Sequence, residues 1–344
     1  GRLRGGLRRG AQRGAPPAVG GFSGHAYDTP ILLADARLDA GLPMAIDPFM
    51  GDDGVVVLLP FGDGWYRATI WDRTRQGVPI EEPVGVEEVR DALLRITGDD
   101  LGLAEMRWSI RFLSERRQAR EYRVGRVFLA GDAAHVHSPL GAMGMSTGIQ
   151  DAANLSWKLI AADGRWAPSW LLDTYHSERH PIGKTVLRLT DTLRRVAEAP
   201  AAVRAVRPYL FPKIVNHPWV SEELRLMFAG MSITYPVPDQ VAESPLAGTR
   251  VPDLALLLGE QASRLYEHLG DSRFVLVDTT QSLPADDDPW PDRLRVLRSS
   301  RPLPLGKATT ILVRPDGYTA WTATFPSAGQ VRKALVQWLQ RSGT

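Results

Sequence analysis

The chain has 344 residues, of which 44% are hydrophobic and 23% are charged, a globular composition long enough for two or three domains. It contains no Cys, which excludes disulfides, thiolate metal sites and cysteine nucleophiles. The 41 basic and 39 acidic residues give a net charge of +2, too even to favour a polyanionic partner for the whole chain. No apolar run is long enough to cross a bilayer and none follows the basic N-terminus, so we expect a cytoplasmic protein without a signal peptide.

The first 24 residues combine arginines with Gly and Pro and contain almost no large apolar side chain. Such a stretch cannot offset its ordering entropy by burial, so residues 1–24 are expected to form a basic, disordered segment. A nucleic-acid-binding arm is the alternative for a basic tail. No aromatic side chain is interleaved among the arginines for stacking, and we therefore expect no nucleic-acid partner.

Residues 25–119 are expected to form an antiparallel sheet with one covering helix. The Asp-Gly pair at Asp63 and Gly64, between two β-branched or aromatic runs, predicts a hairpin. The helix is predicted over 86–95 with Gly98 as its stop. Strands are predicted over 31–38, 55–60, 65–71 and 106–113.

Residues 120–245 are expected to continue with a short buried strand and several helices. The strand covers 126–132, and a Gly-rich turn separates it from a helix over 147–161. A longer helical pattern over 170–198 should be ended or kinked by Pro181. A further helix is predicted over 221–228, with Ser221 as its N-cap.

Residues 246–344 follow a Pro-rich linker and mix strands with a closing helix, which predicts a separate C-terminal domain. The Pro-Asp-Gly turn within 314–317 predicts a hairpin. Strands are predicted over 274–278, 293–296, 308–313 and 318–323, and a helix over 330–339.

The sequence over 125–148 gives the most information about a possible ligand-binding site. It predicts a strand that delivers the carboxylate of Asp132 at its C-terminal end, followed by small residues that let the backbone approach a ligand. A helix then begins, and its N–H groups and positive dipole end point back into the same space. This arrangement suits a polyol hydroxyl on the carboxylate and an electron-rich oxygen on the helix. A flavin supplies both, in its ribityl chain and its pyrimidine carbonyl.

The same stretch resembles the second FAD-binding motif of the class A flavoprotein monooxygenases, the para-hydroxybenzoate hydroxylase-like family. The resemblance rests on Gly-Asp-Ala-Ala-His at 131–135, Pro139, the Gly-rich turn and Asp-Ala-Ala-Asn-Leu-Ser-Trp-Lys-Leu at 151–159. More loosely, 33–38 and 59–70 resemble the substrate-domain sheet of that family, and 175–181 its following long helix. Residues 312–321 resemble the thioredoxin-like C-terminal domain of its aromatic polyketide hydroxylases, so the likeness covers about 22–344.

The resemblance implies an α/β (α+β) protein with the FAD/NAD(P)-binding monooxygenase fold, an antiparallel substrate sheet and a C-terminal thioredoxin-like domain. The Gly-x-Gly-x-x-Gly segment that opens family members has no counterpart here, so we expect an N-terminally truncated form of the fold. By the resemblance, Asp132 holds the ribityl hydroxyls and Pro139 lies near the flavin ring. The expected cofactor-binding residues are Gly131, Asp132, Pro139, Gly141, Gly144, Met145 and Ser146, and the candidate substrate contacts are Trp65 and Trp108.

The function implied is hydroxylation of an aromatic or polyketide substrate by FAD, with NAD(P)H and O2 as co-substrates and a flavin C4a-hydroperoxide as the oxygen donor. No catalytic side chain is assigned and no membrane partner is expected; a homodimer is a further possibility. The alternative is a non-catalytic remnant or interaction module of the family that binds no FAD. Two other motifs are weaker. Gly144–Gly148 matches a serine nucleophile elbow but lacks the preceding strand, and His135 and His137 lack an evident third metal ligand.

Overall fold

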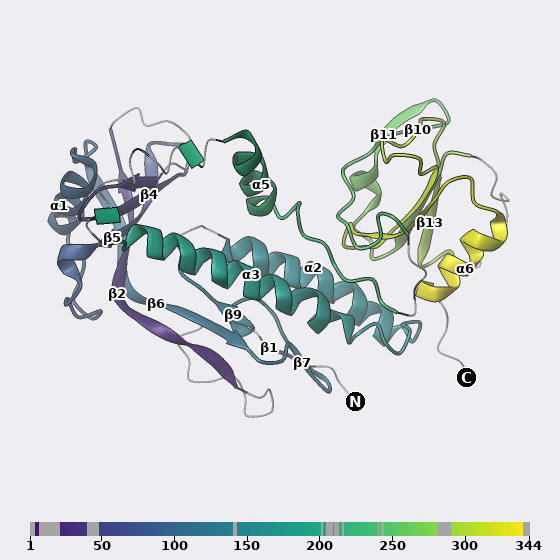
Figure 1. The fold of residues 1–344 in the computed structure, drawn as a ribbon, viewed down its shortest axis with the longest axis horizontal. Coiled ribbons are helices and arrows are strands. Elements are labelled where there is room, and N and C mark those ends of the chain that lie inside the picture. The colour runs from purple at the N-terminus through teal and green to yellow at the C-terminus, as the bar shows by residue number, and fades with distance from the viewer. Residues whose placement is uncertain are drawn as a thin grey trace. The chain divides into compact units, whose positions relative to one another are not determined.

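The computed structural model describes residues 4–6, 21–39, 48–139, 143–200, 202–203, 209, 213–214, 217–239, 241, 244–280 and 290–339 (Figure 1). The chain divides into two compact units, unit 1 with 1–145 and 183–221, and unit 2 with 146–182 and 222–344. Two long helices contribute to both units, so the division cuts across the segment expected over 120–245.

A six-stranded antiparallel sheet dominates unit 1, with the strand order β3-β4-β5-β2-β6-β9. The neighbouring strands β2 and β6 are much longer than the sequence predicts, because their pairing continues before residue 31 in β2 and after residue 113 in β6. The expected hairpin is present, and its strands pair from Gly54 opposite Asp72 to Pro60 opposite Tyr66. The strands are β2 (Phe22–Arg37), β3 (Pro48–Met50), β4 (Gly54–Pro60), β5 (Trp65–Asp72), β6 (Glu105–Ala119) and β9 (His135–Val136).

Helix α1 (Val86–Thr97) covers one face of this sheet, as the sequence predicts. Its buried residues Val89, Ala92, Leu93 and Ile96 have the i, i+3, i+4, i+7 spacing of one helix face. They pack on inward-facing side chains of β2, β4 and β5. Gly98 ends the helix in the left-handed region, at a φ of 84°, and its N–H donates to a carbonyl of the last turn.

The opposite face of the sheet is only partly covered. Because side chains alternate along a strand, Trp108, Ile110 and Phe112 of β6 lie on the face opposite to α1. Leu33 of β2 is directly paired with Ile110 and shares this face. Trp108 and Ile110 remain 43% and 44% exposed, so the face presents apolar surface to solvent.

A second, three-stranded sheet in unit 1 has the order β1-β8-β7. Strand β1 (Arg4–Gly6) pairs in parallel with β8 (Val127–Leu129), and β7 (Arg123–Val124) pairs antiparallel with β8. The expectation of a disordered segment over 1–24 is therefore wrong for 4–6 and for 22–24, which begins β2. Backbone pairing holds the glycines of β1 without requiring side-chain burial. The rest of that segment, apart from Gly21, lies outside the described residues.

Helices α2 (Gly144–Asp163) and α3 (Thr174–Ala197) are the two long helices shared between the units (Figure 1). The helix does not end at Pro181, since α3 runs through it, and a kink at this position stays a prediction. A helix-interior proline costs about 3 kcal/mol, and buried contacts on both sides of Pro181 offset this cost. Glu178 and Arg179 form buried ion pairs before it, and Gly183 is closely packed after it. No helix in the described part of the chain is both long and apolar enough to span a membrane.

The C-terminal part of unit 2 is a four-stranded mixed sheet with the order β13-β12-β14-β15. Its strands are β12 (Phe274–Asp278), β13 (Leu294–Arg298), β14 (Thr310–Val313) and β15 (Thr319–Ala323). Strands β12 and β13 are parallel and the other two pairs are antiparallel. A separate hairpin, β10 (Ala255–Leu258) with β11 (Gln261–Arg264), was not foreseen from the sequence.

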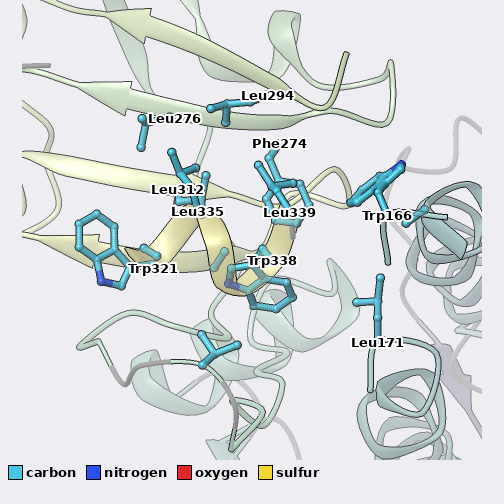
Figure 2. Close-up of a cluster of buried hydrophobic side chains, with 14 of the residues drawn as sticks. Trp166, Leu171, Phe274, Leu276, Leu294, Leu312, Trp321, Leu335, Trp338 and Leu339 are labelled. Carbon is cyan, nitrogen blue, oxygen red and sulfur yellow. The ribbon is translucent and has the colours of Figure 1, made fainter. Parts of the chain in front are cut away.

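Helix α6 (Ala328–Leu339) packs its apolar side chains against this sheet, as Figure 2 shows for Leu335, Trp338 and Leu339 beside Phe274 and Leu312. Trp157 and Ala161 of α2 belong to the same core, as do Trp166 and Leu171 from the connection to α3. Within unit 2, one apolar core therefore joins α2 and the connection that follows it to the C-terminal sheet.

Helix α5 (Pro218–Phe228) begins earlier than the sequence predicts. Ser221 is not its N-cap but lies inside the helix, where its hydroxyl donates to the carbonyl of Pro218 at 3.1 Å. Proline is favoured at the first helical position because its fixed φ suits the helix and its missing N–H is not needed there.

A cluster of buried charges also joins α2, α3 and the β14–β15 turn within unit 2. Glu178 of α3 accepts hydrogen bonds from Asn154 at 2.6 Å, Lys158 at 2.7 Å and Arg314 at 2.8 Å. Arg314 also donates to Asp316 at 2.6 Å. Burial alone would raise the pKa of Glu178, but the positive charges of Arg314 and Lys158 outweigh it and lower this pKa to about 2. Burial, with Arg314 adding to it, lowers the pKa of Lys158 to about 8.

Replacing Gly183 by Ala should destabilise the protein. A helix-interior Gly→Ala change normally gains about 1 kcal/mol. Here the added methyl group would overlap the hydroxyl of the fully buried Tyr122 and lie 2.9 Å from the Gln118 amide nitrogen. We expect a net loss of about 1–3 kcal/mol in the free energy of unfolding, measured by urea denaturation. The double variant with Tyr122→Phe should recover part of the loss, and additive losses would contradict the clash.

Replacing Glu178 by Gln should destabilise the protein by about 3–5 kcal/mol at pH 7, because Lys158 and Arg314 would stay buried with one fewer anion. In the wild type, the lowered pKa of Glu178 contributes stability of about 3 kcal/mol above pH 4.5, which is lost as the pH falls from 4.5 toward 2. Denaturation of the variant across this range should show a smaller loss. Glu222→Gln, at an exposed ion pair with Arg225, serves as the control and should behave as the wild type.

Candidate functional site

The predicted flavin turn starts where β8 ends. The chain leaves the strand at Gly131, whose φ of 58° lies in the left-handed region that favours glycine. A short 3-10 turn, η3 (Gly131–Ala133), follows, and the N–H of Ala134 closes it on the Gly131 carbonyl at 2.8 Å. Asp132 therefore sits on a turn at a strand tip, as the sequence predicts.

The carboxylate of Asp132 is accessible to a ligand. The residue is exposed, and within the described part of the chain neither a hydrogen bond nor an ion pair occupies its oxygens. The backbone on either side is fixed, because β9 directly after the turn pairs with Arg117 and Gln118 of β6. A rigid turn that presents an uncommitted carboxylate is what a hydroxyl-rich ligand requires.

His137 follows β9 and lies beside the first residue of α2. Its Nδ1 is 2.8 Å from the Ser138 carbonyl. A carbonyl only accepts, so Nδ1 carries the hydrogen and Nε2 is left as an acceptor. Nε2 is buried and has no hydrogen-bond partner in the part of the chain that the structure describes. A Cβ built on Gly144 would lie 3.2 Å from it, so glycine at 144 lets the helix start approach this ring closely.

Helix α2 begins at Gly144, three residues before the start expected from the sequence. Gly144, Met145 and Ser146 form its first turn, whose N–H groups have no acceptor within the helix. The Met145 side chain is 80% exposed. Pro139 is half-buried on the turn before the helix, and Gly141 lies outside the described residues.

Burial lowers the pKa of His137, and the nearby His135 adds to this while the Ser138 carbonyl and Asp132 oppose it. The ring is therefore neutral near pH 7 and keeps its Nε2 lone pair. Sequence reasoning found no third metal ligand near His135 and His137 and did not identify this acceptor. The sequence signal that was available for this acceptor is the position of both histidines between Gly131–Asp132 and Gly144, where α2 starts.

The two candidate substrate residues, Trp65 and Trp108, lie on the open face of the six-stranded sheet. The guanidinium of Arg107 stands 4.5 Å from the Trp65 ring centroid, and that of Arg67 stands 5.2 Å from the Trp108 ring centroid. Asp35 pairs with Arg67 at 2.8 Å on the same face. The two rings therefore belong to a cluster of cations stacked on aromatic faces.

Along β6, Ile110 and Phe112 lie nearer than Trp108 to Gln118, the residue that pairs with β9 beside the flavin turn. Ten residues of strand separate Trp108 from Gln118, or about 33 Å along the strand. Leu33 and Ile110 are thus further candidates for substrate contact that sequence reasoning missed, and Phe112 lies on the same face. Their alternation along β6 was the available signal, but it does not reveal which face stays open.

Comparison with known proteins matches both parts of the chain to families. Residues 22–190 match the FAD binding domain family, and residues 244–342 match the family described as aromatic-ring hydroxylase, C-terminal. A Bacillus subtilis protein described as the uncharacterized aromatic compound monooxygenase YhjG is 36% identical over 89% of this chain and 62% of its own length. The 12-dehydrotetracycline 5-monooxygenase/anhydrotetracycline 6-monooxygenase of Streptomyces rimosus is 37% identical over 87% of this chain and 61% of its own length.

Among solved structures, the Diels-Alderase PyrE3 of pyrroindomycin biosynthesis matches with a TM-score of 0.73 and 33% identity, over 93% of this chain and 65% of its own. The chain thus spans less than two thirds of the length of each of these relatives. The mixed α/β fold with its antiparallel sheet is consistent with the family matches and with these relatives. The chain therefore belongs to the proteins that combine an FAD binding domain with the C-terminal domain of aromatic-ring hydroxylases.

Proposed function

We propose that this chain acts in the FAD-dependent hydroxylation of an aromatic or polyketide substrate, with NAD(P)H and O2 as co-substrates. The observation that supports this most directly is the turn that follows β8. It brings the Asp132 carboxylate and the Nε2 of the half-buried His137 together with the first turn of α2, and neither polar group has a hydrogen-bond partner among the described residues. Both family matches and the monooxygenase relatives point to the same chemistry.

These residues fit a flavin. Asp132 would accept hydrogen bonds from the ribityl hydroxyls, and the N–H groups of Gly144, Met145 and Ser146 would face the pyrimidine oxygen. Pro139 would lie near the ring, and Gly131 would allow the backbone to approach it. Bound FAD would supply the redox chemistry with NAD(P)H and O2. The positive end of α2 would stabilise negative charge on the pyrimidine side of the ring.

The substrate would contact the open face of the six-stranded sheet. A planar aromatic substrate needs apolar surface that is not already buried by the protein, and Leu33, Ile110 and Phe112 provide it nearest to β9. Trp65 and Trp108 extend the same face away from β9, together with Arg67 and Arg107, whose cations would suit phenolate or carboxylate groups at the far end of an extended substrate.

We expect the purified chain to bind FAD and stay yellow through gel filtration. Asp132→Asn should weaken FAD binding at least about tenfold, because hydrogen bonds to a carboxylate are stronger than those to an amide. Flavin fluorescence titration measures the affinity. Asp163→Asn, at an exposed position at the other end of α2, is the matched control and should leave it unchanged. A chain that remains colourless after FAD addition would overturn the proposal in favour of a module that binds no FAD.

Replacing Ile110 by Glu should raise the KM for a tetracyclic aromatic polyketide about tenfold or more, because a charge would face the apolar substrate surface. The side chain is 44% exposed, so the melting temperature should change little. Steady-state NADPH oxidation stimulated by the polyketide measures the effect. Leu94→Glu, at a 53% exposed leucine on α1, is the control. Equal effects of the two variants would rule out the open face as the substrate surface.

A further inference from the structure

Arg179 is a fully buried arginine of α3 that holds the N-terminal part of α2. Its Nε donates to the carboxylate of Asp151 at 2.7 Å, and one terminal nitrogen donates to the carbonyl of Thr147 at 3.2 Å. The other terminal nitrogen donates to the hydroxyl of Tyr235 at 3.1 Å. All four residues lie in unit 2 and are buried.

The helix dipole does not explain this placement. A cation near the N-terminus of a helix is unfavourable, because that end carries partial positive charge. The negative charge of Asp151 balances the positive charge of Arg179. Both side chains are fully buried, so removing either one would leave the other as an unpaired buried charge. The bond to Thr147 is then the informative contact, since it joins the guanidinium to a backbone carbonyl one turn from Gly144, where α2 starts.

The neighbouring residue Glu178 contacts a different part of α2. Its carboxylate accepts from Asn154 and Lys158, two and three turns further along the helix, and from Arg314 of the C-terminal sheet. Consecutive residues of α3 therefore hold α2 at two separate places. Glu178 fixes the later turns to the C-terminal sheet, and Arg179 fixes the first turns.

We propose that Arg179 is a positioning residue for the flavin site, because it sets the direction of the first turn of α2, whose N–H groups would face the flavin. This inference rests on the proposed function. Lysine cannot reproduce the role. It has one nitrogen and no planar fork, so it cannot bind the Asp151 carboxylate, the Thr147 carbonyl and the Tyr235 hydroxyl in the same geometry.

The test compares the wild type with Arg179→Lys, first without FAD. Amide hydrogen exchange at 148–152 reports the first turns of α2, and exchange at 158–162 reports the turns held by Glu178. We expect the variant to exchange about tenfold faster at 148–152 and unchanged at 158–162. Arg111→Lys is the matched control, because Arg111 is also a buried arginine and pairs with a carboxylate, that of Glu88 on α1 at 2.6 Å in unit 1.

With FAD, Arg179→Lys should weaken binding about tenfold and shift the flavin absorption spectrum, whereas Arg111→Lys should change neither. Faster exchange along the whole of α2, or equal effects of the two variants on the flavin, would show that Arg179 only stabilises the fold and would overturn the inference. A wild type that binds no FAD would overturn the proposed function, and the exchange data alone would then decide whether Arg179 holds the first turns.

Discussion

The arrangement of unit 2 depends on the rule that charges buried in a protein must be paired. Glu178 and Arg179 are both almost completely removed from solvent, and so are Asp151, Lys158 and Arg314, to which they bind. A small rotation or slide of α2 against α3 would break several of these pairs at once and leave an uncompensated charge in a medium of low dielectric constant. The apolar core around Trp157 and Trp338 would tolerate such a shift better, because apolar contacts are not directional. The charges thus select one register of the helices from those that the core alone would allow.

This constraint explains why α3 can contain a proline and remain one helix. The residues directly before Pro181 are committed to buried ion pairs, and Gly183 directly after it lies against Tyr122 in unit 1. A break at 181 would release both sets of contacts. The sequence pattern around Pro181 describes only the local cost of proline, and tertiary packing decides the outcome.

The elements of the candidate flavin site were easier to predict from the sequence than the long-range contacts that hold these elements in place. The Gly131–Asp132 turn and the start of α2 depend on local sequence, since a glycine with positive φ, a short strand and a helix N-terminus are all encoded within about twenty residues. The pairing of Glu178 with Arg314 joins residues 136 positions apart, and no local pattern reveals it. The same is true of β1, whose three residues carry no strand signal and form a strand through backbone pairing with β8. Which face of the six-stranded sheet stays open was also beyond the sequence, because alternation along β6 shows two faces without showing what covers either.

If FAD supplies the redox chemistry, the protein itself has to hold the cofactor and bind the substrate. The relatives include both monooxygenases and a Diels-Alderase, so one fold accommodates different chemistry. In the function proposed for this chain, the turn after β8 would hold the flavin and the open face of the six-stranded sheet would contact the substrate. In this chain the two are physically separate along β6. The pairing of β6 with β9 fixes one end of the strand beside Asp132 and His137, while Ile110 and Trp108 lie further along it on a face that the protein leaves open. Substitutions on that face can change what is bound without disturbing the turn, because no buried charge and no backbone pairing of the turn depends on those side chains.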